Sequence, residues 1–227
     1  MVNQYVAQAL CLTVIMIFSS GFRIQQDLKW DINENDPTVW LDVDAAVLAF
    51  TFSNSDFDDG YDALTGVAAE NQARVVIQEI INDYNNISTS YLRLALPDAP
   101  ATEDSAVSTF DLPGRTIKIV FGSPSALGAS GYATYSGSAY IDECTVTLSE
   151  TALSSAQEFK ATLTHELGHC MTLDHTHADR DSIMSYNRTS GMHRLGVDEK
   201  IAMTYLYPTD DDYAEEVATL GLSCSRL

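Results

Sequence analysis

The sequence predicts a layered α/β (α+β) fold in which a sheet packs against helices. Short runs with the two-residue period of strands alternate with longer segments whose apolar residues recur at helical steps of three and four. Hydrophobic residues make up 45% of the 227 positions, which is enough for one domain with a full core. We therefore expect strand, helix, strands, helix and helix to follow one another in a single unit.

The first half of the chain is predicted to hold strands and one long helix. Apolar side chains alternate over residues 38–43, and an apolar run at 47–52 is predicted to continue as a strand. Residues 53–62 are polar and are predicted to form a loop. A helix is predicted over about 64–87, where apolar residues recur on one face.

Two more strands are predicted in the middle of the chain, over 116–121 and 140–148. Residues 97–114 contain three prolines and are predicted to be a loop. The segment 122–137 is rich in Gly, Ser, Ala and Tyr, and its pattern favours neither a helix nor a strand.

Two helices are predicted towards the C-terminus. Ser155 and Glu158 have the spacing of a capping box, and an apolar stripe follows them, so a long helix begins at Ser155. A second helix is predicted from about Asp198 to Leu206, where Pro208 ends it.

The N-terminal residues 1–21 predict an export signal. A mostly apolar run reaches Phe18, and the small residues after it allow cleavage after Gly21. The run is short for a membrane span, so we expect a secreted, extracellular protein. Because no basic residue precedes the run, an uncleaved anchor or a buried strand stays the alternative. Residues 22–208 then form the folded domain, and 209–227 form an acidic tail.

The charge of the chain is strongly negative, with 32 acidic residues against 12 basic ones and a net charge of -20. Such a field repels phosphate backbones and anionic lipid. We therefore expect no nucleic-acid partner and, after signal cleavage, no membrane partner.

Removal of the signal leaves three cysteines, Cys144, Cys170 and Cys224. An odd number permits at most one internal disulfide. Cys170 directly follows a histidine of the motif below, but a helix turns by about 100° per residue and points the thiol away from that ring. We expect Cys170 to pair with Cys144, as suits an exported protein, and Cys224 to stay free.

Three of the five histidines fall within residues 165–175. On a helix, His165 and His169 lie one turn apart on the same face, so both can bind one zinc ion. His175 is the natural third ligand, which leaves the fourth position open to water. Glu166 lies near the metal but outside its ligand shell, where it can act as the catalytic base for the zinc-bound water.

This segment resembles the motif of the metzincin clan of zinc peptidases, H-E-x-x-H-x-x-G-x-x-H. Residues 182–186, Ser-Ile-Met-Ser-Tyr, are similar to the clan's Met-turn, in which a Met, here Met184, lies beneath the metal as a hydrophobic floor. The nine-residue step from His175 to Met184 is closest to the matrixin branch, as is the segment 195–208. The resemblance implies a twisted, mostly parallel mixed sheet with two long helices and a small C-terminal lobe around the Met-turn. It also implies that residues 22–208 form the catalytic domain of an endopeptidase acting on protein or peptide substrates.

Two positions depart from the matrixin pattern. Thr172 stands where the clan has Gly, and a β-branched residue costs about 1–3 kcal/mol in a left-handed turn. Either the turn differs or His175 coordinates less well, and the alternative third ligands are then His177 or Asp174. Tyr186 stands where matrixins have Pro and astacin-like or serralysin-like members have Tyr. The resemblance implies that its hydroxyl stabilises the oxyanion, the alternative being a side chain that only packs in the pocket wall.

Two other functions fit the same residues less well. A gluzincin-like peptidase would take a downstream carboxylate such as Glu199 as its third ligand, but His175 and Met184 would then be coincidences. A non-catalytic, zinc-stabilised binding domain would have no need of Glu166. Calcium is not supported, because the acidic residues near Asp56 lack the full ligand pattern of a calcium loop.

Overall fold

The computed structural model describes residues 23–24, 28–57, 64–97, 114–123, 130–176 and 180–213. The predicted export signal, most of the loop at 97–114, His177 and Cys224 lie outside the described residues, as does most of the predicted acidic tail. None of the described helices combines the length and the hydropathy that a membrane span requires.

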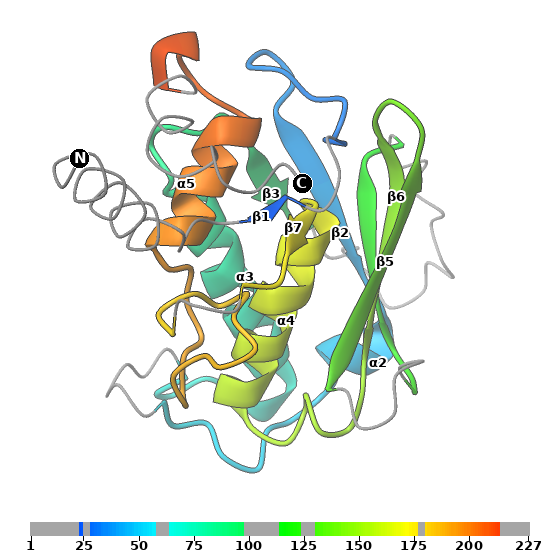
Figure 1. The fold of residues 1–227 in the computed structure, drawn as a ribbon. Coiled ribbons are helices and arrows are strands. Elements are labelled where there is room, and N and C mark those ends of the chain that lie inside the picture. Colours follow the sequence, from blue (N-terminus) through cyan, green and yellow to red (C-terminus); the bar gives the residue numbers. More distant parts are fainter. Residues whose placement is uncertain are drawn as a thin grey trace, which may run out of the picture.

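Five strands form one sheet in the order β3-β2-β4-β6-β5 (Figure 1). They are β2 (Thr38–Val43), β3 (Arg93–Ala95), β4 (Thr116–Phe121), β5 (Gly131–Gly137) and β6 (Ile141–Leu148). All neighbours run parallel except β5, which lies at the edge and runs antiparallel to β6. A separate antiparallel pair joins β1 (Arg23–Ile24) to β7 (Leu173–Asp174). The prediction of a mixed, mostly parallel sheet is confirmed.

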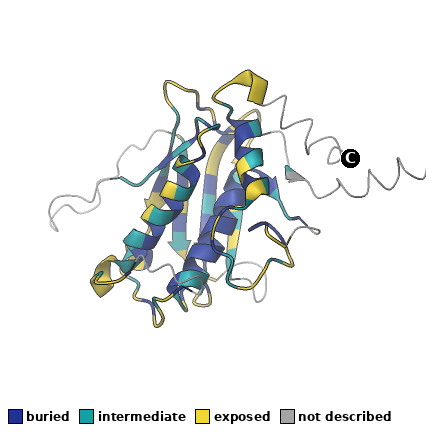
Figure 2. Ribbon diagram, turned by 90° about the vertical axis from the view of Figure 1, so that its left-hand side faces the viewer, coloured by how far each residue is buried: buried dark blue, intermediate teal, exposed yellow. Residues whose placement is uncertain are grey.

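Two long helices, α3 (Gln72–Asn85) and α4 (Ala156–Cys170), pack together against the sheet (Figure 1). The Tyr84 hydroxyl of α3 donates to the Thr164 carbonyl of α4 across 3.2 Å. The shorter helix α5 (Val197–Leu206) lies later in the chain, as predicted. Figure 2 shows that the buried residues concentrate where the helices cover the sheet.

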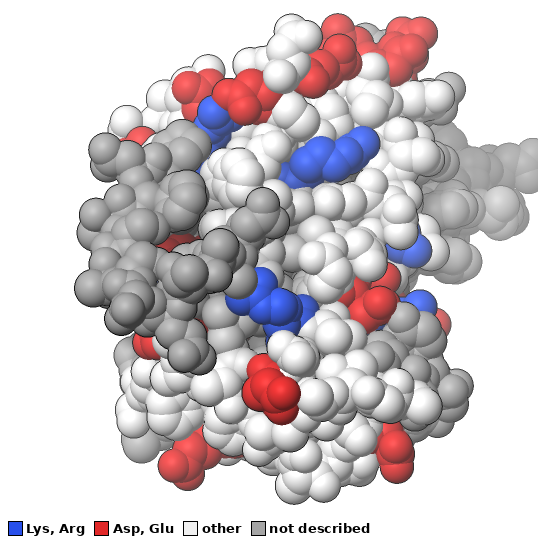
Figure 3. Space-filling model, turned by 180° about the vertical axis from the view of Figure 1, so that it is seen from behind, with Lys and Arg blue, Asp and Glu red and all other residues white. Residues whose placement is uncertain are grey.

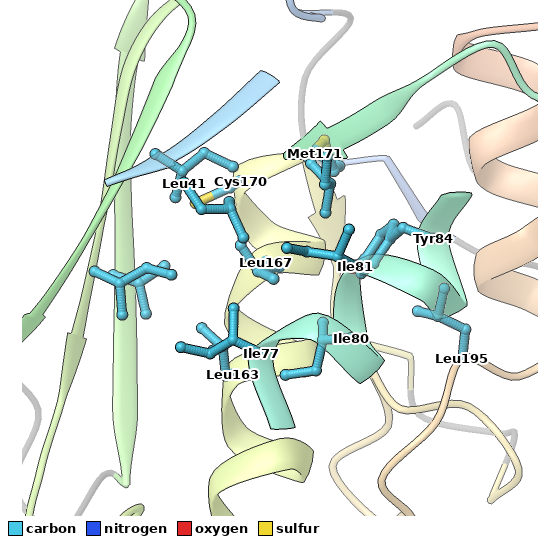
Figure 4. Packing of buried hydrophobic residues seen from close by; sticks show 14 of the residues in the cluster. Leu41, Ile77, Ile80, Ile81, Tyr84, Leu163, Leu167, Cys170, Met171 and Leu195 are labelled. Atoms are coloured by element: carbon cyan, nitrogen blue, oxygen red, sulfur yellow. The ribbon is translucent and has the colours of Figure 1, made fainter. Parts of the chain in front are cut away.

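The core lies between the two long helices and the sheet. Ile77, Ile80 and Ile81 of α3 face Leu163 and Leu167 of α4 (Figure 4), and all of these side chains are buried. β2 contributes Leu41 from the sheet. The apolar stripes that predicted these helices are thus the faces that bury one another, at about 25 cal/mol for each square ångström of apolar surface removed from water.

The predicted strand at 47–52 is wrong, because the chain turns into a short helix, α2 (Ala45–Leu48). The Asp44 side chain accepts a hydrogen bond from the Ala46 N–H at 2.9 Å and so caps the first turn. Val47 and Phe52 are nevertheless buried. The apolar run therefore reflects burial rather than an extended backbone.

The predicted helix at 64–87 begins later than expected. Gly66 has a positive φ of 76°, which breaks the helical path, and a 3-10 helix (Ala69–Asn71) leads into α3. The segment 122–137, for which no conformation was predicted, contains β5. This edge strand is only half-buried or exposed along its length, so it has no apolar alternation to mark it.

A disulfide joins Cys144 of β6 to Cys170 at the end of α4, with 5.7 Å between the Cα atoms. The predicted pairing is confirmed. The bond ties the sheet to the helix that carries two motif histidines, and a loop of this size contributes about 3 kcal/mol of stability.

Candidate metal centre

Helix α4 positions His165 and His169 one turn apart. Ser155 caps the helix, since its hydroxyl oxygen accepts the Glu158 N–H at 3.1 Å. Almost every residue of α4 is buried, including His165, so the helix cannot rotate without losing its packing.

Two backbone carbonyls orient these imidazoles. Nδ1 of His165 lies 2.8 Å from the Ile183 carbonyl oxygen, and Nδ1 of His169 lies 2.8 Å from that of Leu173. A carbonyl can only accept, so each Nδ1 carries the proton and each Nε2 is left with a free lone pair. Both rings therefore present Nε2 as a metal-binding atom.

The chain reverses after α4 through Thr172, whose φ is 64°, the one positive φ of a non-glycine among the described residues. Its amide donates to the His169 carbonyl at 2.8 Å, and its hydroxyl donates to the Leu28 carbonyl at 3.0 Å. Thr172 thus adopts the left-handed conformation expected of Gly at this position. The buried hydroxyl bond offsets part of the strain.

The turn brings His175 to the other two histidines. Nε2 of His175 lies 3.2 Å from Nε2 of His165, and one ligand atom from each of His165, His169 and His175 lies within 4.8 Å of the others. Around a tetrahedral ion with bonds of about 2.0–2.1 Å, ligand nitrogens lie about 3.3 Å apart. The three side chains could therefore hold a metal ion.

Of the candidates for the third ligand that the structure describes, His175 joins this cluster. Asp174 lines the same cleft, but its carboxylate accepts the His175 backbone N–H at 2.8 Å and is not part of the cluster. His177 lies outside the described residues.

The surroundings keep the imidazoles of His165 and His169 neutral. Burial, then the neighbouring His169, lower the pKa of His165 to about 3. Burial also lowers the pKa of His169, although the Leu173 hydrogen bond opposes the shift. Neutral imidazole is the form that binds a metal, so no proton has to be displaced near neutral pH.

Glu166 lies beside the cluster but outside it, as the motif predicted. Burial raises the pKa of its carboxyl group to about 7, opposed by a hydrogen bond from the Ala133 backbone and by the charge of Arg188. Gly131 of β5 passes so close that a Cβ there would lie 2.8 Å from the Glu166 Cγ. The edge strand and the Glu166 side chain thus pack directly against each other.

Met184 forms a buried floor under the helix. A Cβ on Gly168, the residue before His169, would overlap the Met184 sulfur atom, so Gly168 is what lets the turn approach α4. Below the turn, the Glu199 carboxylate accepts from the Ser182 hydroxyl, from the Met184 N–H at 3.3 Å and from the Gly196 N–H at 2.8 Å. Glu199 therefore supports the turn from α5 and does not reach the histidine cluster.

Tyr186 lies at the mouth of the site. Its ring stacks on that of His175, with centroids 4.0 Å apart and planes 20° apart, and 61% of the side chain is exposed. The backbone of Thr176 joins both segments, donating to the Met184 carbonyl at 3.1 Å and accepting from the Tyr186 N–H at 3.2 Å. The loop that carries His175 and the turn that carries Tyr186 are thus held together.

These residues line an open cleft of about 540 Å³ between α4 and β5. Its walls include three residues that no motif marked: Gly131, Thr162 and Arg188. Gly131 and Thr162 meet only when β5 folds back along α4, so no local pattern could reveal them. Arg188 had a weak signal in the sequence, as a cation shortly after the Met-turn of a strongly acidic chain.

No protein-family model matches the sequence, and no curated protein matches it at a significant level. The resemblance to metzincins therefore depends on the motif residues themselves.

Proposed function

We propose that the chain is a zinc-dependent endopeptidase of the metzincin kind, with His165, His169 and His175 as zinc ligands and Glu166 as the general base. The observation that carries the proposal is the convergence of three imidazoles beside a buried carboxyl group on the floor of an open cleft. A structural metal site needs no such carboxyl group and is usually closed by a fourth protein ligand.

The donor set supports zinc over other common ions. Three clustered imidazole nitrogens, two of them 3.2 Å apart, are typical of catalytic zinc, whereas calcium and magnesium prefer oxygen ligands. Zinc held there would lower the pKa of a coordinated water to about 7 and polarise the carbonyl group of a substrate.

Glu166 would carry the proton. A cation in the histidine cluster favours the carboxylate form, which can accept a proton from the attacking water. Burial favours the protonated form, so the carboxyl group can hold that proton until it passes it to the leaving amine. The Ala133 N–H holds the group against β5 during both steps.

The edge strand β5 supports an extended peptide as the substrate. It is paired on one side only among the described strands, and its residues line the cleft next to the histidine cluster. A peptide that adds to this edge as a further strand is held by backbone hydrogen bonds, independently of its sequence. Its scissile carbonyl would then lie over the three imidazoles.

Secretion is a further proposal, supported by the disulfide, because disulfides persist mainly in oxidising compartments. Expression of the full chain, followed by N-terminal sequencing of protein recovered outside the cell, tests both export and cleavage after Gly21.

The test of the central proposal compares wild type with Glu166→Gln for casein hydrolysis and zinc content. We expect wild type to carry one zinc ion per chain and to lose activity with phenanthroline. Glu166→Gln should keep the zinc and the fold but lose turnover. Equal hydrolysis by both proteins, or zinc binding without any hydrolysis by wild type, would contradict the proposal and favour a binding domain.

A further inference from the structure

Arg188 places a positive charge in the cleft, and the proposed hydrolysis does not use this charge. Arg188 is the only Lys or Arg that lines it among the described residues, and its side chain is half-buried. It acts electrostatically on both Glu166 and His165. Because a cation beside metal-binding histidines disfavours the metal, its position calls for another explanation.

Arg188 also makes no ion pair with any described residue. The chain has 32 acidic residues against 12 basic ones, and Arg115, Lys118 and Lys160 each pair with a carboxylate. On the face shown in Figure 3, acidic groups gather along one edge and the few basic groups lie apart from one another. The cleft therefore holds a guanidinium that pairs with no described carboxylate and can receive an anionic group of a substrate.

Arg188 lies at one end of the cleft. It also lines a neighbouring hollow formed by Ser155, Glu158 and Ala161, which belong to the start of α4. Thr162 and Glu166 thus lie between this end of the helix and His169. Asp174 lines the opposite end, where its charge acts on Tyr135.

The direction of β5 decides which part of a substrate meets Arg188 when the substrate pairs antiparallel to that strand, as β6 does on its other side. The strand begins at Gly131, next to Thr162 and Glu166, and passes Tyr135 further on. A peptide that runs antiparallel to β5 enters beside Tyr135 and leaves beside Gly131. Residues after the scissile bond therefore lie at the Arg188 end, which is also where Glu166 can reach the leaving amine.

We propose that Arg188 is a specificity-determining residue that selects substrates with an Asp or Glu side chain directly after the scissile bond. The inference rests on the proposed peptidase function and adds the substrate class. A guanidinium binds a carboxylate through two parallel hydrogen bonds, and such charge-assisted bonds are about twice as strong as neutral ones. The preference should be on the order of 10- to 100-fold in kcat/KM.

The first experiment uses peptides that share one sequence, taken from a site that the enzyme cleaves in denatured casein. They differ only in the residue after the scissile bond, which is Asp, Asn or Lys. Wild type should prefer Asp, Arg188→Gln should remove the preference, and Arg188→Glu should shift it to Lys. Arg188→Lys should keep part of it, and the matched control Arg180→Gln, an exposed position outside the cleft, should keep all of it. Equal cleavage of the Asp and Asn peptides by wild type would overturn the inference while leaving the peptidase proposal intact.

The second experiment separates this inference from the proposed function. Zinc-loaded Glu166→Gln, with and without Arg188→Gln, is titrated with the same labelled peptides, and binding is followed by fluorescence anisotropy. Tighter binding of the Asp peptide that disappears with Arg188→Gln supports the anionic subsite, even if no protein hydrolyses peptides. Equal affinities for the Asp and Asn peptides overturn it.

Discussion

Single residues decide how the third histidine reaches the site. Thr172 holds a φ of 64°, which β-branched residues resist, and its hydroxyl bond to the Leu28 carbonyl holds the turn against the N-terminal segment. Next to it, the Trp30 indole donates to the Cys170 carbonyl at 3.1 Å. The end of α4 is thus closed by the Leu28 carbonyl and the Trp30 indole, which belong to a segment about 140 residues earlier.

We expect Thr172→Gly and Thr172→Val to behave differently. Gly relieves the backbone strain but loses the hydroxyl bond, so the stability and the zinc affinity should change by less than about 1 kcal/mol. Val has the same shape, keeps the strain and leaves the Leu28 carbonyl unpaired, so it should cost about 1–3 kcal/mol. Urea unfolding and zinc competition measure both changes. A Gly variant that is less stable than the Val variant would show that the strain at Thr172 is unimportant.

A second prediction at this scale concerns Tyr186, whose ring already stacks on His175 and whose side chain faces the cleft. If its hydroxyl stabilises the oxyanion, Tyr186→Phe should lower kcat and kcat/KM together by on the order of 100-fold, with KM little changed. Zinc content should not change. A Phe variant within about twofold of wild type would assign Tyr186 to wall packing alone.

At the scale of elements, the site depends on the close approach of α4 and the Met-turn. Gly168 is the point of contact, because any side chain there would overlap the Met184 sulfur. Glu199 of α5 holds the turn from below through three hydrogen bonds. The small lobe after α4 is therefore held to the helix by packing and to α5 by a buried carboxylate.

Gly168→Ala should cost about 1–3 kcal/mol of stability, as overpacking usually does, and should weaken zinc binding by displacing the turn. In a Met184→Ala background the same change should cost little, since the obstructing sulfur is gone. A double-mutant cycle by denaturant unfolding measures this coupling. Additive effects of the two substitutions would mean that the two residues do not press on each other.

At the scale of the whole molecule, the histidine cluster brings together side chains from two separate parts of the chain. α4 supplies two imidazoles and the loop after β7 supplies the third, while the Met-turn supports them from below. A zinc ion held there would act as a cross-link, and its binding free energy would add to the stability of the folded state.

Zinc at 100 times its dissociation constant should raise the free energy of unfolding by about 2.7 kcal/mol, seen as a higher Tm. His175→Ala should remove most of this gain, whereas the control His177→Ala should keep it. The reverse result would identify His177 as the third ligand and exclude His175.

The local patterns of the sequence were sufficient for the two long helices, most of the strands, the Cys144–Cys170 pair and the grouping of His165, His169 and Glu166. These features depend on spacing within one element or on a strong apolar period, and both are visible in a single sequence. The sequence predicts backbone strain at Thr172. It does not predict the hydrogen bond from the Thr172 hydroxyl to the Leu28 carbonyl, because only folding brings that carbonyl near.

Only the tertiary structure decided the rest. The apolar run at 47–52 proved to be a buried helix and loop, because burial alone does not say whether a backbone is extended. The sequence did not predict β5, because an exposed edge strand has no apolar face to bury and so lacks the apolar alternation of a strand. The role proposed for Arg188 depends on β5, since only the fold places that strand beside α4 and the cation at one end of the cleft between them. Contacts between distant segments do not depend on a local periodicity, so no pattern within a single segment of the sequence predicts them.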